Sequence, residues 1–78
     1  MKFRMNINFG GVNYDSMVGE GDKTIEELSS KWSGDINTYD WLSIELHDGS
    51  FLSLSKEAIG RTAFVFCEIK EPKYNGNL

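Results

Sequence analysis

The sequence predicts an α+β fold, with an antiparallel sheet of about five strands and one short helix on one face, in the order ββαβββ. Two pairs of alternating segments are each joined by a turn that contains glycine, Gly10-Gly11 in the first pair and His47-Asp48-Gly49 in the second. A helix-start signal lies between the two pairs, at residues 24–27. Because the connections are short, neighbouring strands should pair antiparallel. A small curled barrel with the helix as plug or lid is the alternative architecture.

The chain has 78 residues, which predicts one small domain over residues 1–72 and a flexible C-terminal tail over residues 73–78. Pro72 should end the last strand because proline cannot donate to a sheet ladder. No apolar run approaches 18 residues, and the N-terminal segment lacks the continuous apolar stretch of a signal peptide. The single Cys67 excludes an internal disulfide, so we expect a cytoplasmic location.

Residues 2–18 predict a first hairpin, because apolar and polar side chains alternate before the Gly10-Gly11 turn. Pairing Phe9 with Val12 continues to Phe3 opposite Val18. The hairpin then has one buried face and one solvent-exposed face, as antiparallel sheets allow.

Residues 19–22 read as a flexible acidic connector that leads into a helix. Thr24 and Glu27 have the spacing of a capping box. Gly34 is the expected stop, which gives a helix of about nine residues that must be held by packing on the sheet. The residues of its apolar stripe are Ile25, Leu28 and Trp32. Residues 35–40 should form a loop anchored by Ile36 and Tyr39.

Residues 41–55 predict the central hairpin, and its register can be derived. A two-residue loop would send Leu52 and Leu54 to the face opposite Ile44. A three-residue loop, 47–49, pairs Ile44 with Leu52 and needs Gly49 in the left-handed conformation. The predicted core set is Leu42, Ile44, Leu46, Leu52 and Leu54. The opposite face carries Trp41, Ser43, Glu45, Phe51, Ser53 and Ser55.

Residues 55–60 read as a single turn of helix ended by Gly60, and residues 61–70 as the last strand. Both faces of that strand are apolar, with Phe64 and Phe66 on one side and Val65 and Cys67 on the other. Such a strand should be central or covered on both faces.

Residues suited to catalysis or to metal binding are few, and we expect no enzyme, no cofactor and no metal. His47 lies in a tight turn, where exposure is usual, and Cys67 lies in an apolar strand, where a buried structural role is expected. The chain has no other histidine or cysteine to complete a zinc site. The acidic residues near the helix start lack the spacing of a calcium loop.

Charge and exposed aromatics point to a protein partner. The net charge is −4, and residues 5–55 hold nine Asp and Glu against two lysines. This balance argues against direct nucleic-acid binding and suits a partner protein with a basic surface. Large aromatic side chains on the face of the central hairpin that should be solvent-exposed suggest a contact surface, for such a partner or for a second copy of the protein. The predicted protein-binding residues are Trp41, Phe51, Glu45, Tyr39, Asp40, Asp35, Glu26 and Glu27.

The sequence therefore predicts a small acidic, non-enzymatic protein-interaction module. In size and charge it is similar to inhibitors encoded by phages and mobile elements, including anti-CRISPR and DNA-mimic proteins, although no motif carries that likeness. A homodimeric structural or accessory domain of a bacterial or phage family is the alternative.

Overall fold

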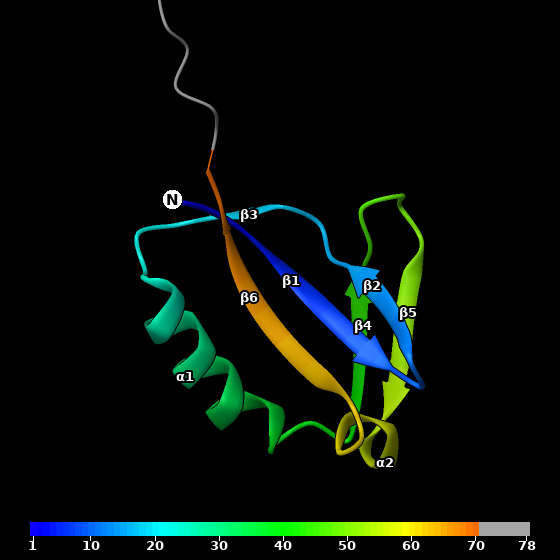
Figure 1. The fold of residues 1–78 in the computed structure, drawn as a ribbon. Coiled ribbons are helices and arrows are strands. Elements are labelled where there is room, and N and C mark those ends of the chain that lie inside the picture. The colour runs from blue at the N-terminus through cyan, green and yellow to red at the C-terminus, as the bar shows by residue number, and fades with distance from the viewer. Residues whose placement is uncertain (71–78) are drawn as a thin grey trace, which may run out of the picture.

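A computed structural model describes residues 1–70 and shows an α+β fold with antiparallel sheets, as the sequence predicts (Figure 1). The predicted domain end at residue 72 and the predicted tail at residues 73–78 lie outside the described residues. The elements are β1 (Lys2–Phe9), β2 (Val12–Asp15), β3 (Gly19–Glu20), α1 (Ile25–Ile36), β4 (Trp41–Glu45), β5 (Phe51–Ser55), α2 (Lys56–Ile59) and β6 (Ala63–Ile69).

Strand β1 lies at the centre of a four-stranded sheet, with β2 and β3 along one edge and β6 along the other. Strands β4 and β5 form a separate hairpin. A bridge between Ser16 and Leu46 joins the two sheets, and the His47 N–H donates to the Asp15 carbonyl oxygen at 3.1 Å. Helix α1 lies beside β6, on the side away from β1 (Figure 1).

The first hairpin has the predicted register at its turn, where Phe9 pairs with Val12, but not at its far end. There Phe3 lies opposite Gly19 instead of Val18. The shift arises at Ser16, whose side-chain hydroxyl, in place of a backbone carbonyl, accepts the Met5 N–H at 2.9 Å. The Phe3 ring covers Gly19, where an added Cβ would lie 2.5 Å from the end of the ring, so any larger residue would require the ring to move. The predicted connector therefore includes the short strand β3.

Helix α1 begins as predicted and ends later than predicted. The Thr24 hydroxyl accepts the Glu27 N–H at 3.2 Å, and the Glu27 carboxylate accepts the Thr24 N–H at 3.4 Å, which completes the capping box. The helix passes through Gly34 and runs to Ile36, with Asn37 as its C-cap, so Gly34 is not the stop. Because Gly34 is not in the left-handed conformation, it does not close the helix.

The central hairpin has the predicted three-residue loop. Ile44 pairs with Leu52, Trp41 with Ser55, and Gly49 has a φ of 87°. The loop closes through the Leu46 N–H, which donates to the Ser50 carbonyl oxygen at 2.7 Å. The predicted single turn of helix is also present, as α2, with Ser55 as its N-cap and Gly60 as its C-cap.

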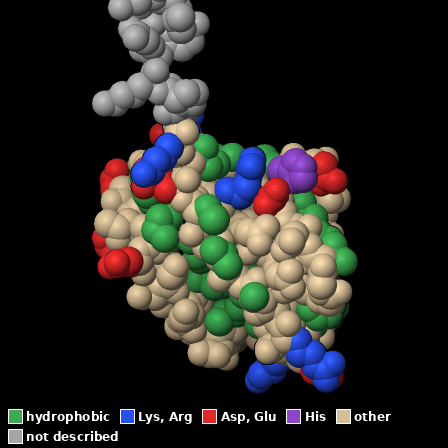
Figure 2. Space-filling model, viewed as in Figure 1, with side chains coloured by type: hydrophobic (Ala, Val, Ile, Leu, Met, Phe, Trp, Pro, Cys, Tyr) green, Lys and Arg blue, Asp and Glu red, His purple; other side chains and the backbone are tan. Residues whose placement is uncertain are grey.

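The prediction that the last strand, β6, is central or covered on both faces is wrong. Within residues 1–70 it pairs with β1 alone, so it is an edge strand. Its inner face carries Phe64 and Phe66, which α1 covers, while Val65 is 51% exposed and Cys67 is exposed. Hydrophobic side chains are accordingly visible over β6 on the surface that Figure 2 presents. An apolar pattern on both faces does not distinguish a covered strand from an edge strand with one open face.

The core lies where the inner faces of the two sheets meet. Met5 and Ile7 of β1 pack against Ile44 and Leu46, and Ile7 is fully buried. Trp32 of α1 contacts this cluster from the side. No helix within residues 1–70 has the length and apolar character needed to cross a membrane.

Candidate functional site

The outer face of the β4–β5 hairpin carries the largest exposed aromatic side chains among residues 1–70. Because side chains alternate along each strand, this face is the reverse of the one that supplies Ile44 and Leu54 to the core. Trp41 is 61% exposed and Phe51 is 66% exposed. We call this surface the aromatic face; it consists of Trp41, Ser43, Glu45, Phe51, Ser53 and Ser55.

The register places the two rings at opposite ends of the aromatic face. Trp41 stands opposite Ser55, and Phe51 stands opposite Glu45. Four residues along the strand separate these pairs, which corresponds to about 13 Å at the usual strand rise. Between them the hydroxyls of Ser43 and Ser53 are 3.0 Å apart and hydrogen-bonded to each other. The aromatic face thus has one large ring at each end and a polar centre, the hydrogen-bonded pair Ser43 and Ser53, which we call the serine floor.

Charges lie at both ends of the aromatic face. Glu45 lies directly across from Phe51, and within residues 1–70 it forms no ion pair. Asp40 precedes Trp41, and its carboxylate lies 3.7 Å from Lys56 Nζ, with both side chains well exposed. A cationic side chain of a partner would therefore meet an unpaired carboxylate next to an aromatic ring, which favours its binding.

The structure brings together only some of the residues predicted to bind protein. Trp41, Glu45 and Phe51 share one face, and Asp40 lies beside them. Tyr39 turns away, because its ring packs against Trp32 of α1 at a centroid distance of 6.4 Å. The other predicted residues, Glu26, Glu27 and Asp35, all lie on α1, at the opposite flank of the molecule (Figure 1).

Two of these α1 carboxylates already have partners. Glu27 closes the capping box. Asp35 Oδ2 lies 3.0 Å from Lys31 Nζ, and this hydrogen bond and charge raise the pKa of Lys31 above its ordinary value. The α1 acids are therefore partly compensated and do not form an open array of negative charge.

A groove between α1 and the sheet is a feature that sequence reasoning missed. No residue of α1 is fully buried, and a cavity of about 380 Å³ remains between the helix and the inner face of the sheet. The available signal was weak: the 12-residue helix has a narrow apolar stripe of only four residues, Ile25, Leu28, Trp32 and Ile36, and none of its residues is fully buried. We call this cavity the α1 groove; it is lined by Phe3, Met5, Ser16, Leu28, Lys31, Trp32, Asp35, Tyr39 and Phe66.

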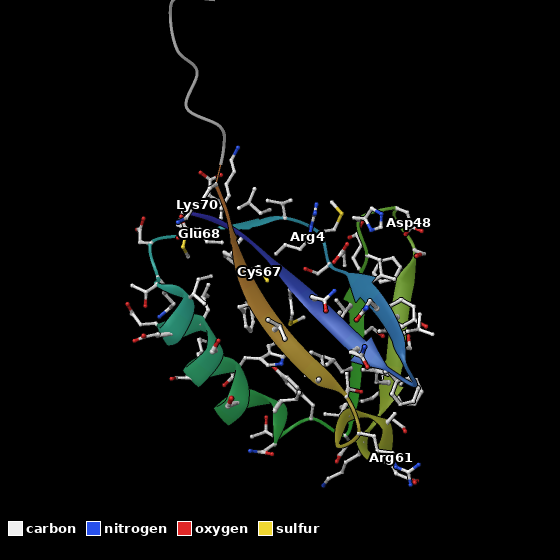
Figure 3. All side chains as sticks on the ribbon, in the orientation of Figure 1. Arg4, Asp48, Arg61, Cys67, Glu68 and Lys70 are labelled. Carbon is white, nitrogen blue, oxygen red and sulfur yellow. The ribbon has the colours of Figure 1, made fainter. Side chains whose placement is uncertain are left out.

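The two residues that the sequence offered for catalysis lie in open positions. His47 is exposed in the β4–β5 turn. Cys67 was predicted to be buried and is exposed, on the outer face of β6 opposite Arg4 of β1 (Figure 3). Among the residues that the structure describes, no three His, Cys, Asp or Glu side chains gather in a way that would hold a metal ion.

Asp48, in the same turn as His47, has a structural role. Its carboxylate accepts the hydroxyl and the backbone N–H of Ser50, and these hydrogen bonds hold the pKa of Asp48 below its ordinary value. Asp48 therefore stabilises the turn as an ionised carboxylate.

No protein-family model, no curated protein and no solved structure matches this chain.

Proposed function

We propose that this protein is a non-enzymatic protein-interaction module that acts by occupying the surface of another protein through the aromatic face. The observation that carries the proposal is the exposure of Trp41 and Phe51, 61% and 66%, on a face that no described segment covers. The hairpin requires only its inner face for the core, so neither aromatic is needed there for packing.

Burial of these two rings supplies enough free energy to matter in binding. The exposed part of each ring system is on the order of 100–150 Å², which at about 25 cal/mol per Å² corresponds to roughly 3 kcal/mol per ring. Trp is among the residues that most often dominate protein–protein affinity. The serine floor between the rings supplies hydroxyls for hydrogen bonds at the same contact.

The partner we propose has a basic surface. The chain carries a net charge of −4, and Glu45 lies across from Phe51 without an ion pair in residues 1–70. A small chain bound in this way blocks whatever its partner would otherwise bind, which is the action of a phage-type inhibitor. Because Glu27 and Asp35 are engaged within α1, the proposal rests on the aromatic face and not on DNA mimicry.

Affinity capture tests the proposal. The chain serves as bait beside a Trp41→Ala/Phe51→Ala double variant and a Val12→Ala variant, which truncates a 50% exposed side chain at the β1–β2 turn. We expect a bound protein that is retained by the wild type and by Val12→Ala, is lost from the double variant, and elutes as salt is raised. A protein retained equally by all three baits would contradict a role for the aromatic face.

A homodimer is the second candidate, and the diagonal placement of the rings favours it. In a twofold contact, residue i of one copy meets residue j of the other and the reverse. Trp41 of each copy would then lie beside Phe51 of the other, over the serine floor. Sedimentation equilibrium separates the candidates: a dimer that dissociates in the double variant supports self-association, and a strict monomer removes it.

A further inference from the structure

Strand β5 has an open edge. One edge of β5 pairs with β4 over the whole strand, and within residues 1–70 no strand pairs with the other edge. Helix α2 continues from the end of β5 and does not run along it (Figure 1). The outer edge of β6, by contrast, is flanked by α1, whose Trp32 ring packs on Phe64 and Phe66. An added strand therefore has access to β5 but not to β6.

The turn of the hairpin determines which backbone groups of β5 point outward. The Leu46 N–H donates to the Ser50 carbonyl oxygen at 2.7 Å. Because bonded and non-bonded pairs alternate along an antiparallel ladder, the N–H and C=O groups of Phe51 and Ser53 point away from β4. No hydrogen bond within residues 1–70 satisfies these groups. They are a ready template for another strand.

The usual protections of an edge strand are missing from β5. Natural edge strands carry lysine, proline, inward-pointing charges or bulges that prevent pairing with another chain. Phe51–Ser55 has the sequence FLSLS, with no charged residue, no proline and no glycine. Its register with β4 is continuous over all five residues, so the ladder contains no bulge. The edge is therefore open to association.

A second copy of β5 is complementary to the first. Antiparallel pairing about a twofold axis at Ser53 places Ser53 opposite Ser53, Phe51 opposite Ser55 and Leu52 opposite Leu54 of the second copy. Each large ring then lies opposite a small side chain, and the half-buried Leu52 gains an aliphatic neighbour. A shift by one residue would place Phe51 opposite Leu54 and mix the two faces. The self-pairing thus continues both faces of the hairpin.

The charges next to β5 also favour a second copy. The same pairing brings Lys56, directly after β5, to the turn of the other copy, which carries Asp48. Lys56 is 72% exposed and lies 3.7 Å from Asp40, so it remains accessible. The neighbouring Glu57 is held by Arg61 at 2.8 Å. Because the contact is twofold, this attraction between opposite charges occurs at both ends of the ladder.

We propose that two copies of the protein pair through their β5 edges and form one continuous antiparallel sheet in the order β4–β5–β5–β4. Strand addition of this kind takes its affinity from main-chain hydrogen bonds. The contact leaves the aromatic faces of both copies uncovered on the same side of the joined sheet. It therefore differs from the face-to-face homodimer described above, and it does not depend on the proposed function. A partner protein then meets two aromatic faces at once.

Sedimentation equilibrium of two lysine variants tests this proposal. Ser53→Lys and Ser43→Lys are matched, because the two exposed hydroxyls bond each other and either substitution removes the same hydrogen bond. In the joined sheet the two Ser53 residues lie about 5.5 Å apart, whereas the two Ser43 residues lie about 14 Å apart on the outer strands. Ser53→Lys should weaken the dimer about tenfold or more. Ser43→Lys should leave its dissociation constant within about twofold.

A charge exchange and hydrogen exchange examine the register directly. Ser53→Glu alone should also be monomeric, while an equimolar mixture of Ser53→Lys and Ser53→Glu should restore a dimer, because opposite charges then face each other. In the ¹⁵N-labelled wild type, the Phe51 and Ser53 amides should exchange slowly at concentrations that form the dimer and rapidly on dilution. Far-ultraviolet circular dichroism confirms that each variant is folded.

Three results would overturn the proposal. One is a wild-type protein that stays monomeric at millimolar concentration. Another is equal weakening by Ser53→Lys and Ser43→Lys, which would place the contact on the aromatic face instead of the edge. The third is a dimer whose Ser53 amide exchanges as fast as in the monomer. None of these results bears on capture of a foreign partner by the aromatic face, which the bait experiment tests separately.

Discussion

Replacing Gly49 by alanine isolates the contribution of one backbone angle to the stability of the central hairpin. Gly49 has a φ of 87°, and a Cβ added there would meet no atom within 4 Å. Crowding therefore contributes nothing, and the whole cost is that of holding a side chain in the left-handed region. Gly34 is the matched control, because its added Cβ also meets nothing within 4 Å but its φ lies in the ordinary helical region of α1.

The two substitutions should act in opposite directions. A side chain in the left-handed region costs about 1–2 kcal/mol, so Gly49→Ala should destabilise by that amount. Alanine in a helix interior is better than glycine by about 0.5–1 kcal/mol, so Gly34→Ala should stabilise. The two variants should therefore differ by roughly 1.5–3 kcal/mol. For a domain of this size, 1 kcal/mol moves Tm by roughly 4–8 °C, so the difference is easily measured.

Thermal and urea unfolding, followed by far-ultraviolet circular dichroism, give both values. Gly49→Val should be at least as destabilised as Gly49→Ala, while Gly49→Asn should lose less, because asparagine tolerates the left-handed conformation. Equal stability of Gly49→Ala and Gly34→Ala would refute the bulged turn, and with it the register that places Trp41 and Phe51 on one face.

Four further outcomes follow from the structure. Ile7→Ala, at the one fully buried side chain within residues 1–70, should cost about 2–5 kcal/mol in urea unfolding. Thr24→Ala should cost about 0.5–2 kcal/mol, because it removes the helix N-cap. Because its pKa is lowered, ionised Asp48 stabilises the folded protein at pH values above the ordinary carboxyl range, and this stabilisation is lost as pH falls below about 4. Ser50→Ala should therefore make the free energy of unfolding depend less on pH in the acid range. Trp41→Thr should leave stability within about 0.5 kcal/mol of the wild type.

Features encoded by neighbours in sequence were predictable. The hairpin register followed from side-chain alternation and from the position of Gly49, and the helix start followed from Thr24 and Glu27. Each of these signals involves residues that touch across a turn, so the sequence displays both partners together. The same alternation predicts that Trp41 and Phe51 lie on one face of the hairpin, and the observed strand pairing confirms it.

Features set by distant packing were not predictable in this way. The register shift before β3 depends on the Ser16 hydroxyl taking the place of a carbonyl, which alternation does not record. The exposure of Cys67 depends on β6 lying at an edge, and the α1 groove depends on how far the helix stands from the sheet. The acids assigned to one protein-binding site come from two elements, because α1 carries Glu26, Glu27 and Asp35 away from the β4–β5 hairpin.

The placement of the aromatics separates folding from binding in this chain. The inner face of the central hairpin supplies Ile44, Leu46 and Leu54 to the core, and the turn geometry depends on Gly49. None of these contributions involves Trp41 or Phe51, whose exposure leaves roughly 3 kcal/mol of burial free energy per ring unused in residues 1–70. Threonine, which also favours strands, would occupy those positions at little cost to the hairpin. The exposure of two large rings that the fold does not need is the reason we propose a contact with another molecule.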